Sequence, residues 1–128
     1  MREIKFRAWD KELNFMINIK RYKIDFNGQV LFDNNDKELY NQTNKIELMQ
    51  YTGLKDAINK NEVYEHDIIN LLGIGFLKVE WDYRDTGWIC LDKHYRKRNL
   101  ADVLLNGGIR VGNIYENKEL LNWKILSK

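Results

Sequence analysis

Short runs in which apolar and polar side chains alternate most constrain what this chain can fold into. Residues 3–9, EIKFRAW, place Ile4, Phe6 and Ala8 on one face of an extended segment, and residues 76–81, FLKVEW, alternate in the same way. A period of two fits a strand with one buried face and does not fit a helix. The alternation therefore predicts a mainly β fold.

Length and charge define the class of protein. A chain of 128 residues fits a single domain and buries roughly two-thirds of the surface that it exposes when unfolded. It is 44% hydrophobic, and its net charge is only +2. Disordered chains and strongly basic nucleic-acid-binding proteins are excluded by these values.

Cysteine use and hydropathy indicate the compartment. Cys90 is the only cysteine, so no disulfide can form within the chain and no cysteine-rich metal site is available. A reducing compartment follows from this. We find neither the apolar run of a signal peptide nor that of a membrane span, and we expect a cytoplasmic protein without a cofactor.

Turn residues divide the first half of the chain into hairpins. Residues 10–14, DKELN, predict a turn, because Asp and Asn side chains bond nearby backbone groups and tolerate unusual dihedral angles. Asn27-Gly28 is a strong hairpin signal. A two-residue turn there would split the apolar side chains between two faces. A loop over residues 26–28 instead pairs Ile24 with Val30 and gathers them on one face.

The middle of the chain joins a polar segment to further strands. Residues 33–45 are almost wholly polar, which predicts an exposed loop with one helical turn at residues 36–40. Residues 63–72, VYEHDIINLL, should then run extended. Gly73 and Gly75 allow the chain to reverse tightly after them.

Two short helices are expected near the C-terminus. Asn99 can cap the first, with Gly107 as its stop. Asn117 can cap a second over residues 118–126. Between them, Gly112 interrupts a strand and predicts a bulge or a close approach of the backbone.

One carboxylate group could hold a divalent ion. Glu62, Glu65 and Asp67 surround His66, a composition that a metal-dependent nuclease or hydrolase could use. In an extended segment, however, Glu65 and Asp67 share a face that excludes His66. We therefore interpret these residues as part of a solvated loop.

The densest basic cluster lies after the strand at residues 88–91. Lysine, arginine and an aromatic side chain together could grip nucleic-acid phosphates and bases. The alternative is a solvated loop between two elements, which the balanced charge favours. Nucleic-acid or partner contact at this cluster would involve Arg84, Trp88, Lys93, His94, Arg96, Lys97 and Arg98.

Four blocks carry a family likeness. They are KFRAWD (Lys5–Asp10), LMQYTGLKD (Leu48–Asp56), VYEHDII (Val63–Ile69) and VGNIYEN (Val111–Asn117), the last followed closely by ELL. In sequence and in order they resemble the YopX family of bacteriophage and prophage proteins. The likeness spans almost the whole chain.

The resemblance implies a fold but no activity. It implies an SH3-like β-barrel with N-terminal β-hairpins and one or two short helices near the C-terminus. Within one domain over residues 1–128, a β-meander over residues 1–46 would pack on a barrel over residues 47–128. No reaction, cofactor or catalytic residue comes with the family.

The chain departs from the family pattern in its central loop. Glycine is usual where His66 stands, and Asn-Gly is usual where this chain has residues 59–61, NKN. Non-glycine residues pay more for positive φ, so we expect Asn59 or Asn61 to adopt it. Recognition by this loop would use Lys55, Asn59, Lys60, Asn61 and His66.

These observations favour a non-enzymatic binding module for a protein or nucleic-acid partner, from host or phage, acting away from membranes. A self-assembling structural phage protein is the alternative, since an exposed sheet edge can pair with its own copy. A metal-dependent hydrolase using Glu62, Glu65 and Asp67 is the third hypothesis.

Overall fold

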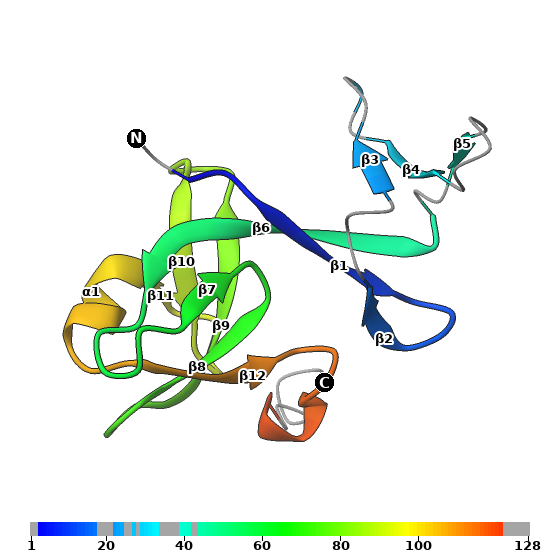
Figure 1. Ribbon diagram of the computed structural model, residues 1–128. Coiled ribbons are helices and arrows are strands. Elements are labelled where there is room, and N and C mark those ends of the chain that lie inside the picture. The colour runs from blue at the N-terminus through cyan, green and yellow to red at the C-terminus, as the bar shows by residue number, and fades with distance from the viewer. Residues whose placement is uncertain are drawn as a thin grey trace. The chain divides into compact units, whose positions relative to one another are not determined.

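Strands dominate the fold, as the alternation predicts. The computed structural model describes residues 3–17, 22–24, 27, 29–33, 39–41 and 44–121. These residues form three antiparallel sheets and two short helices, so the mainly β prediction is confirmed. The elements labelled in Figure 1 are β1 (Phe6–Asp10), β2 (Phe15–Ile17), β3 (Tyr22–Ile24), β4 (Val30–Asp33), β5 (Leu39–Asn41), β6 (Ile46–Lys55), β7 (Glu62–Tyr64), β8 (Asp67–Leu71), β9 (Gly75–Asp82), β10 (Gly87–Leu91), β11 (Lys97–Asn99), α1 (Leu100–Leu105) and β12 (Ile109–Asn113). The 3₁₀ helix η2 (Lys118–Leu121) follows β12.

The chain divides into two compact units, residues 5–50 and residues 1–4 with 51–128. Strand β6 contributes to both: its first half pairs with β1 and its second half with β7. The register of β6 against β7 shifts between Tyr51 and Leu54, where Gly53 has a φ of 86°. The expected packing of an N-terminal meander on a barrel stays a prediction.

In the first unit, the predicted turn after β1 is confirmed. The Asp10 carboxylate accepts hydrogen bonds from the backbone N–H groups of Glu12 (2.9 Å) and Leu13 (2.8 Å). Asn14 adopts a φ of 57°. The turn pairs β1 with β2 and buries Ala8 beside Ile17 in a small apolar cluster. The N-terminal hairpin thus follows from local chemistry.

The second hairpin has the predicted register. Ile24 pairs with Val30 across β3 and β4, as the loop over residues 26–28 requires. The expected left-handed Gly28 lies outside the described residues. The helical turn predicted at residues 36–40 is wrong for its described part, because Leu39 and Tyr40 belong to β5, which pairs with β4. Strand pairing overrides the weak local helix preference there.

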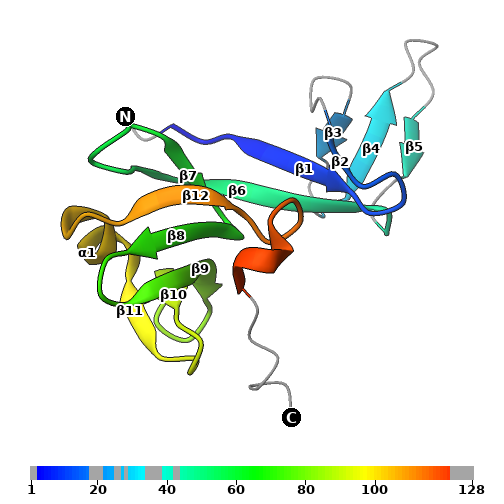
Figure 2. The same ribbon diagram turned by 90° about the horizontal axis from the view of Figure 1, so that it is seen from below.

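A five-stranded sheet in the order β11-β10-β9-β8-β12 forms the main body of the second unit. The predicted apolar face of residues 76–81 is confirmed, with Leu77 and Val79 fully buried and Phe76 exposed. Cys90 lies in the same core, where burial raises the pKa of its thiol to about 12. Helix α1 packs Leu100, Val103 and Leu104 into this core. Figure 2 shows the helix between β11 and β12, the two strands that it connects.

Helix α1 begins and ends where the sequence predicts. The Asn99 side chain accepts a hydrogen bond from the Asp102 backbone N–H at 3.1 Å. Gly107 has a φ of 95°, and the N–H of Gly108 donates to the carbonyl of Val103 at 2.9 Å. This is the Schellman arrangement that closes a helix C-terminus. The turn directs the chain into β12.

Strand β12 contains the predicted irregularity at Gly112. Its register against β8 shifts between Arg110 and Gly112. A Cβ atom at Gly112 would collide with the Asn117 side chain, so a larger residue would have to displace that side chain. The second helix, η2, starts after Asn117 as expected but buries none of its own residues; residues 122–126 of the predicted helix lie outside the described residues.

The predicted extended run over residues 63–72 is wrong at its centre. Glu65 and His66 form a turn between β7 and β8, and His66 adopts a φ of 69°. In the loop before β7, positive φ falls on Lys60 (59°) and on neither Asn59 nor Asn61. The N–H of Lys60 donates to the Asp56 carbonyl at 3.1 Å within its own loop, whereas the N–H of His66 donates to the Val79 carbonyl on β9 at 2.8 Å.

Within the described ranges, no helix has the length and apolar character needed to cross a lipid bilayer.

Candidate functional site

The turn at Glu65-His66 brings two carboxylates to one imidazole. Nε2 of His66 lies 3.4 Å from Oε2 of Glu80 on β9 and 4.0 Å from Oε2 of Glu65. All three side chains are largely but not wholly buried, with 15–24% of their surface exposed. Among the described residues, these three form a group whose ligand atoms all lie within 4.8 Å of one another. Such a group can share a proton or a metal ion.

Two neighbours orient this group. The hydroxyl of Tyr115 lies 3.3 Å from Nδ1 of His66, with the two rings edge to face. Nζ of Lys78 lies 3.0 Å from Oε1 of Glu80. Burial alone would raise the pKa of the Glu80 carboxyl, but hydrogen bonds from His66 and Lys78 hold that pKa below its ordinary value. Glu80 is therefore a carboxylate at neutral pH.

The predicted carboxylate trio is only partly assembled. Glu65 lies beside His66, because a turn does not alternate its side chains as a strand does. Glu62 and Asp67 are not members of this group. The trio hypothesis missed Glu80, whose proximity depends on the pairing of β8 with β9. The sequence signal for Glu80 was only its place on the polar face of residues 76–81.

Asp67 serves the fold. Its carboxylate is fully buried, and Oδ2 accepts hydrogen bonds from the Tyr64 N–H (2.7 Å) and from Nε of Arg110 (3.2 Å). The N–H of Arg110 in turn donates to Oδ2 of Asp56 at 3.1 Å. Arg110 thus joins the loop before β7 and the turn after it to β12.

The predicted recognition loop is held by Asp56. Oδ1 of this buried carboxylate accepts hydrogen bonds from the N–H groups of Asn59 (2.8 Å) and Asn61 (3.4 Å). Burial alone would raise the pKa of Asp56, but these bonds and the one from Arg110 lower it. Lys60, Asn59 and Lys55 are exposed on the loop, whereas His66 lies in the separate turn described above.

The basic cluster is tied to two aspartates. Oδ2 of the buried Asp92 accepts from Nε of Arg96 (3.0 Å) and from a terminal nitrogen of Arg98 (2.7 Å). Nζ of Lys97 lies 3.2 Å from Oδ2 of Asp82. Three of the predicted phosphate-binding cations therefore have carboxylate partners, which weakens the nucleic-acid hypothesis.

The other members of the cluster lie around these ion pairs. Trp88 packs against the apolar core and stacks edge to face on Trp81, with ring centroids 5.0 Å apart. Arg84, Lys93 and His94 are exposed. The backbone N–H of His94 donates to Oδ1 of Asp92 at 2.8 Å.

Asp92 makes stability depend on pH. Burial alone would raise its pKa, but Arg98, Arg96 and the backbone of His94 hold that pKa well below its ordinary value. The carboxylate contributes fully above the unfolded pKa of about 3.9, and this contribution is lost as the pH falls further. We expect Asp92→Asn to be less stable than the parent at pH 7, with a smaller loss of stability between about pH 5 and pH 2.

Urea denaturation at a series of pH values measures this difference. The exposed Glu119→Gln is the matched control and should have the stability of the parent at pH 7. Parallel pH profiles for the parent and Asp92→Asn would contradict the prediction.

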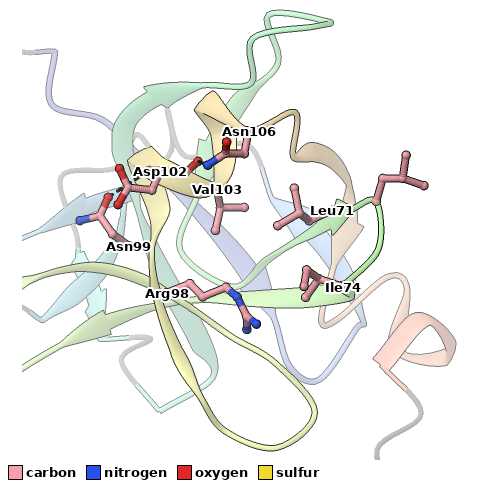
Figure 3. Close-up of a pocket in the computed structure, with 8 residues that line it drawn as sticks. Leu71, Ile74, Arg98, Asn99, Asp102, Val103 and Asn106 are labelled. Atoms are coloured by element: carbon pink, nitrogen blue, oxygen red, sulfur yellow. Dashed lines mark hydrogen bonds between the residues drawn. The ribbon is translucent and has the colours of Figure 1, made fainter.

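An open groove lies between α1 and the turn that joins β8 to β9. Its volume is about 430 Å³. In Figure 3 the side chains of Val103, Leu71 and Ile74 and the guanidinium of Arg98 surround one space. Leu72, at the tip of the turn, is 97% exposed, and Ile74 is 47% exposed. No pattern in the sequence indicates this groove. Its lining consists of Leu71, Leu72, Ile74, Arg98, Asn99, Asp102, Val103 and Asn106.

Comparison with known proteins gives a family. A family model described as "YopX protein" matches residues 5–122, which is most of the chain. The chain belongs to the YopX protein family. This confirms the resemblance found in the sequence. No curated protein matches the chain.

Two solved structures share the YopX fold of this chain. Protein EF1440 from Enterococcus faecalis is 23% identical, with a TM-score of 0.62, over 95% of this chain and all of its own. Protein yopX from Bacillus subtilis is 19% identical, with a TM-score of 0.59, over 95% of this chain and 98% of its own. At this identity the likeness concerns the fold alone.

The YopX block VGNIYEN builds a turn after β12. Oδ1 of the buried Asn113 accepts from the N–H groups of Tyr115 (2.9 Å) and Glu116 (2.8 Å). Oδ1 of Asn117 accepts from the N–H of Asn113 at 3.1 Å, above the bare Cα of Gly112. In this chain the block therefore shapes the backbone, and it also places Tyr115 beside His66.

Proposed function

We propose that this YopX-family chain is a non-enzymatic module that binds a protein through the groove between α1 and the β8–β9 turn. The occupant is a segment of a host or phage protein that inserts a bulky apolar side chain. The observation that carries the proposal is the exposure of Leu72 and Ile74 beside a groove of about 430 Å³. Clefts of this size accommodate large side chains.

The groove has a mixed character that suits a protein partner. Leu71, Ile74 and Val103 supply its apolar lining, and the exposed Asp102 lies on its rim (Figure 3). Interfaces of this kind combine an apolar centre with a polar rim. A Lys or Arg next to the inserted side chain would complement Asp102.

A protein partner is favoured over nucleic acid by the charges. Arg96 and Arg98 bind Asp92, and Lys97 binds Asp82. Phosphate contact would have to replace these ion pairs, and each of them involves a buried carboxylate. Nucleic-acid affinity depends on cations that can neutralise phosphates, so this cluster offers little of it.

Photo-crosslinking followed by affinity measurement tests the proposal. A photoreactive amino acid at position 72 captures the partner from the bacterial lysate, and mass spectrometry identifies it. We then expect Leu72→Asp to weaken binding of the purified partner about tenfold or more by calorimetry, because an apolar side chain that becomes buried on binding carries much of the binding energy. The side chain is so exposed that the fold should tolerate the change.

Ile58→Asp is the matched control, since Ile58 is 59% exposed on the loop before β7. Loss of binding with Leu72→Asp alone supports the groove. Loss with Ile58→Asp alone would assign recognition to the loop and overturn the groove. A salt-sensitive complex with DNA that Leu72→Asp leaves unchanged would favour the nucleic-acid alternative. Self-association that rises with concentration in light scattering, and that Leu72→Asp leaves unchanged, would favour the self-assembling alternative.

The proposal extends to the scaffold and its setting. We propose that the second unit is an SH3-like barrel. In support, β11 and β12 are the two edge strands of its five-stranded sheet, and the six-residue helix α1 connects them directly. We also propose that it is a phage or prophage protein that acts in the bacterial cytoplasm, a reducing compartment in which a single, free cysteine such as the buried Cys90 is common.

A further inference from the structure

The Glu65-His66-Glu80 group lies apart from the groove lining and has its own chemistry. We propose that it binds a zinc-type divalent transition-metal ion through Nε2 of His66 and one carboxylate oxygen each of Glu65 and Glu80. One nitrogen and two oxygens are a ligand set that zinc accepts, with a fourth position left for water.

The distances fit a tetrahedral ion. Ligands about 2.1 Å from zinc lie about 3.4 Å apart in a tetrahedron. Nε2 of His66 and Oε2 of Glu80 are 3.4 Å apart, and Oε2 of Glu65 is 4.0 Å from Nε2. The ligand oxygens of Glu65 and Glu80 lie within 4.8 Å of each other, so rotation of the Glu65 side chain would bring its oxygen to the third ligand position. An imidazole nitrogen disfavours calcium and magnesium, which take oxygen ligands.

The surroundings hold the ligands in place. Metal-binding histidines use their second ring nitrogen to bond a neighbour, which fixes the ring and its tautomer. Here Nδ1 of His66 lies 3.3 Å from the Tyr115 hydroxyl. If Nδ1 carries the proton and donates it to that hydroxyl, the lone pair of Nε2 points toward the carboxylates and is available to a metal ion. Lys78 holds Oε1 of Glu80, which turns Oε2 toward His66.

The backbone fixes the turn that carries two of the ligands. The N–H of His66 donates to the carbonyl of Val79 at 2.8 Å, and its own carbonyl accepts from the N–H of Ile114 at 3.0 Å. His66 is thereby attached to β9 beside Glu80 and to the segment that carries Tyr115. A bound ion would add a bridge from this turn to β9.

The same positions would also suit a protonated imidazole between two carboxylates. Calorimetric titration of EDTA-treated protein with zinc at pH 7.5 separates the two cases. We expect one equivalent of zinc to bind and to raise the melting temperature by a few degrees. Calcium and magnesium should bind at least about tenfold more weakly. No zinc binding would overturn the proposal and leave an ion pair only.

Variants locate the ion. His66→Gly removes one zinc ligand. Glycine adopts the φ of 69° at this position without strain, so the protein should fold while its affinity for zinc falls tenfold or more. Glu80→Gln should weaken binding similarly, and Tyr115→Phe should weaken it less. The matched control is His94→Gln, the other histidine, which is exposed and should leave affinity unchanged. Binding retained in His66→Gly, or lost in His94→Gln, would contradict the assignment.

Discussion

Asp67→Ala is expected to lower the free energy of unfolding by about 3 kcal/mol. The Asp67 side chain is fully buried, and its carboxylate binds both the Tyr64 N–H and the Arg110 side chain. Alanine leaves that N–H without its acceptor and the guanidinium without its counter-ion. Because Arg110 remains 31% exposed, water can solvate it, and the cost stays at the lower end for buried pairs.

Urea denaturation followed by circular dichroism measures this change. Asp67→Asn should cost about half as much, because its carbonyl oxygen can still accept from Tyr64 but no longer carries charge. The exposed Glu119→Ala serves as control and should stay within about 0.5 kcal/mol of the parent. If Asp67→Ala were as mild as this control, Asp67 would not be the structural residue described above.

Gly108→Ala is expected to cost about 2 kcal/mol for a different reason. Its Cβ atom would lie 2.8 Å from side-chain carbons of Ile69 and Val103 and 2.9 Å from the Val103 carbonyl oxygen. That oxygen accepts the hydrogen bond from Gly108 itself at the end of α1. The backbone at Gly108 cannot move away without losing this hydrogen bond, so the side chains of Ile69 and Val103 must shift and loosen the core packing.

Two glycines provide controls for this substitution, measured by the same denaturation. Gly87→Ala meets nothing within 4 Å and has no positive φ, so it should be nearly neutral. Gly107→Ala also meets open space, but its φ of 95° should cost about 1 kcal/mol through backbone strain. A Gly108→Ala variant no less stable than Gly107→Ala would refute the steric explanation.

Part of the candidate site could be predicted from the sequence. His66 was named because it stands where the family usually has glycine, and positive φ is indeed found there. Its partners were not predictable. Glu80 is fourteen positions away and Tyr115 forty-nine, and both reach His66 only through the pairing of β8 with β9 and with β12. Local patterns carry no information on such register.

The groove was missed for a related reason. Leu72 and Ile74 flank Gly73 in a turn that the sequence did predict, but their exposure beside α1 depends on where the helix packs. The basic cluster was found, yet its ion pairs with Asp82 and Asp92 were not. The charge composition gives the number of charged residues but does not predict which of them form ion pairs in the folded protein.

The sequence by itself determined the mainly β class, the first hairpins, the Ile24–Val30 register, the Asn99 cap and the irregularity at Gly112. Each depends on side chains within a few residues of one another, where alternation, capping and steric fit act locally. Only the tertiary structure decided the turn at Glu65-His66, the buried roles of Asp56 and Asp67, and the partners of His66. These depend on pairing between strands distant in sequence, because burial and hydrogen bonding across sheets outweigh the small preferences of single residues.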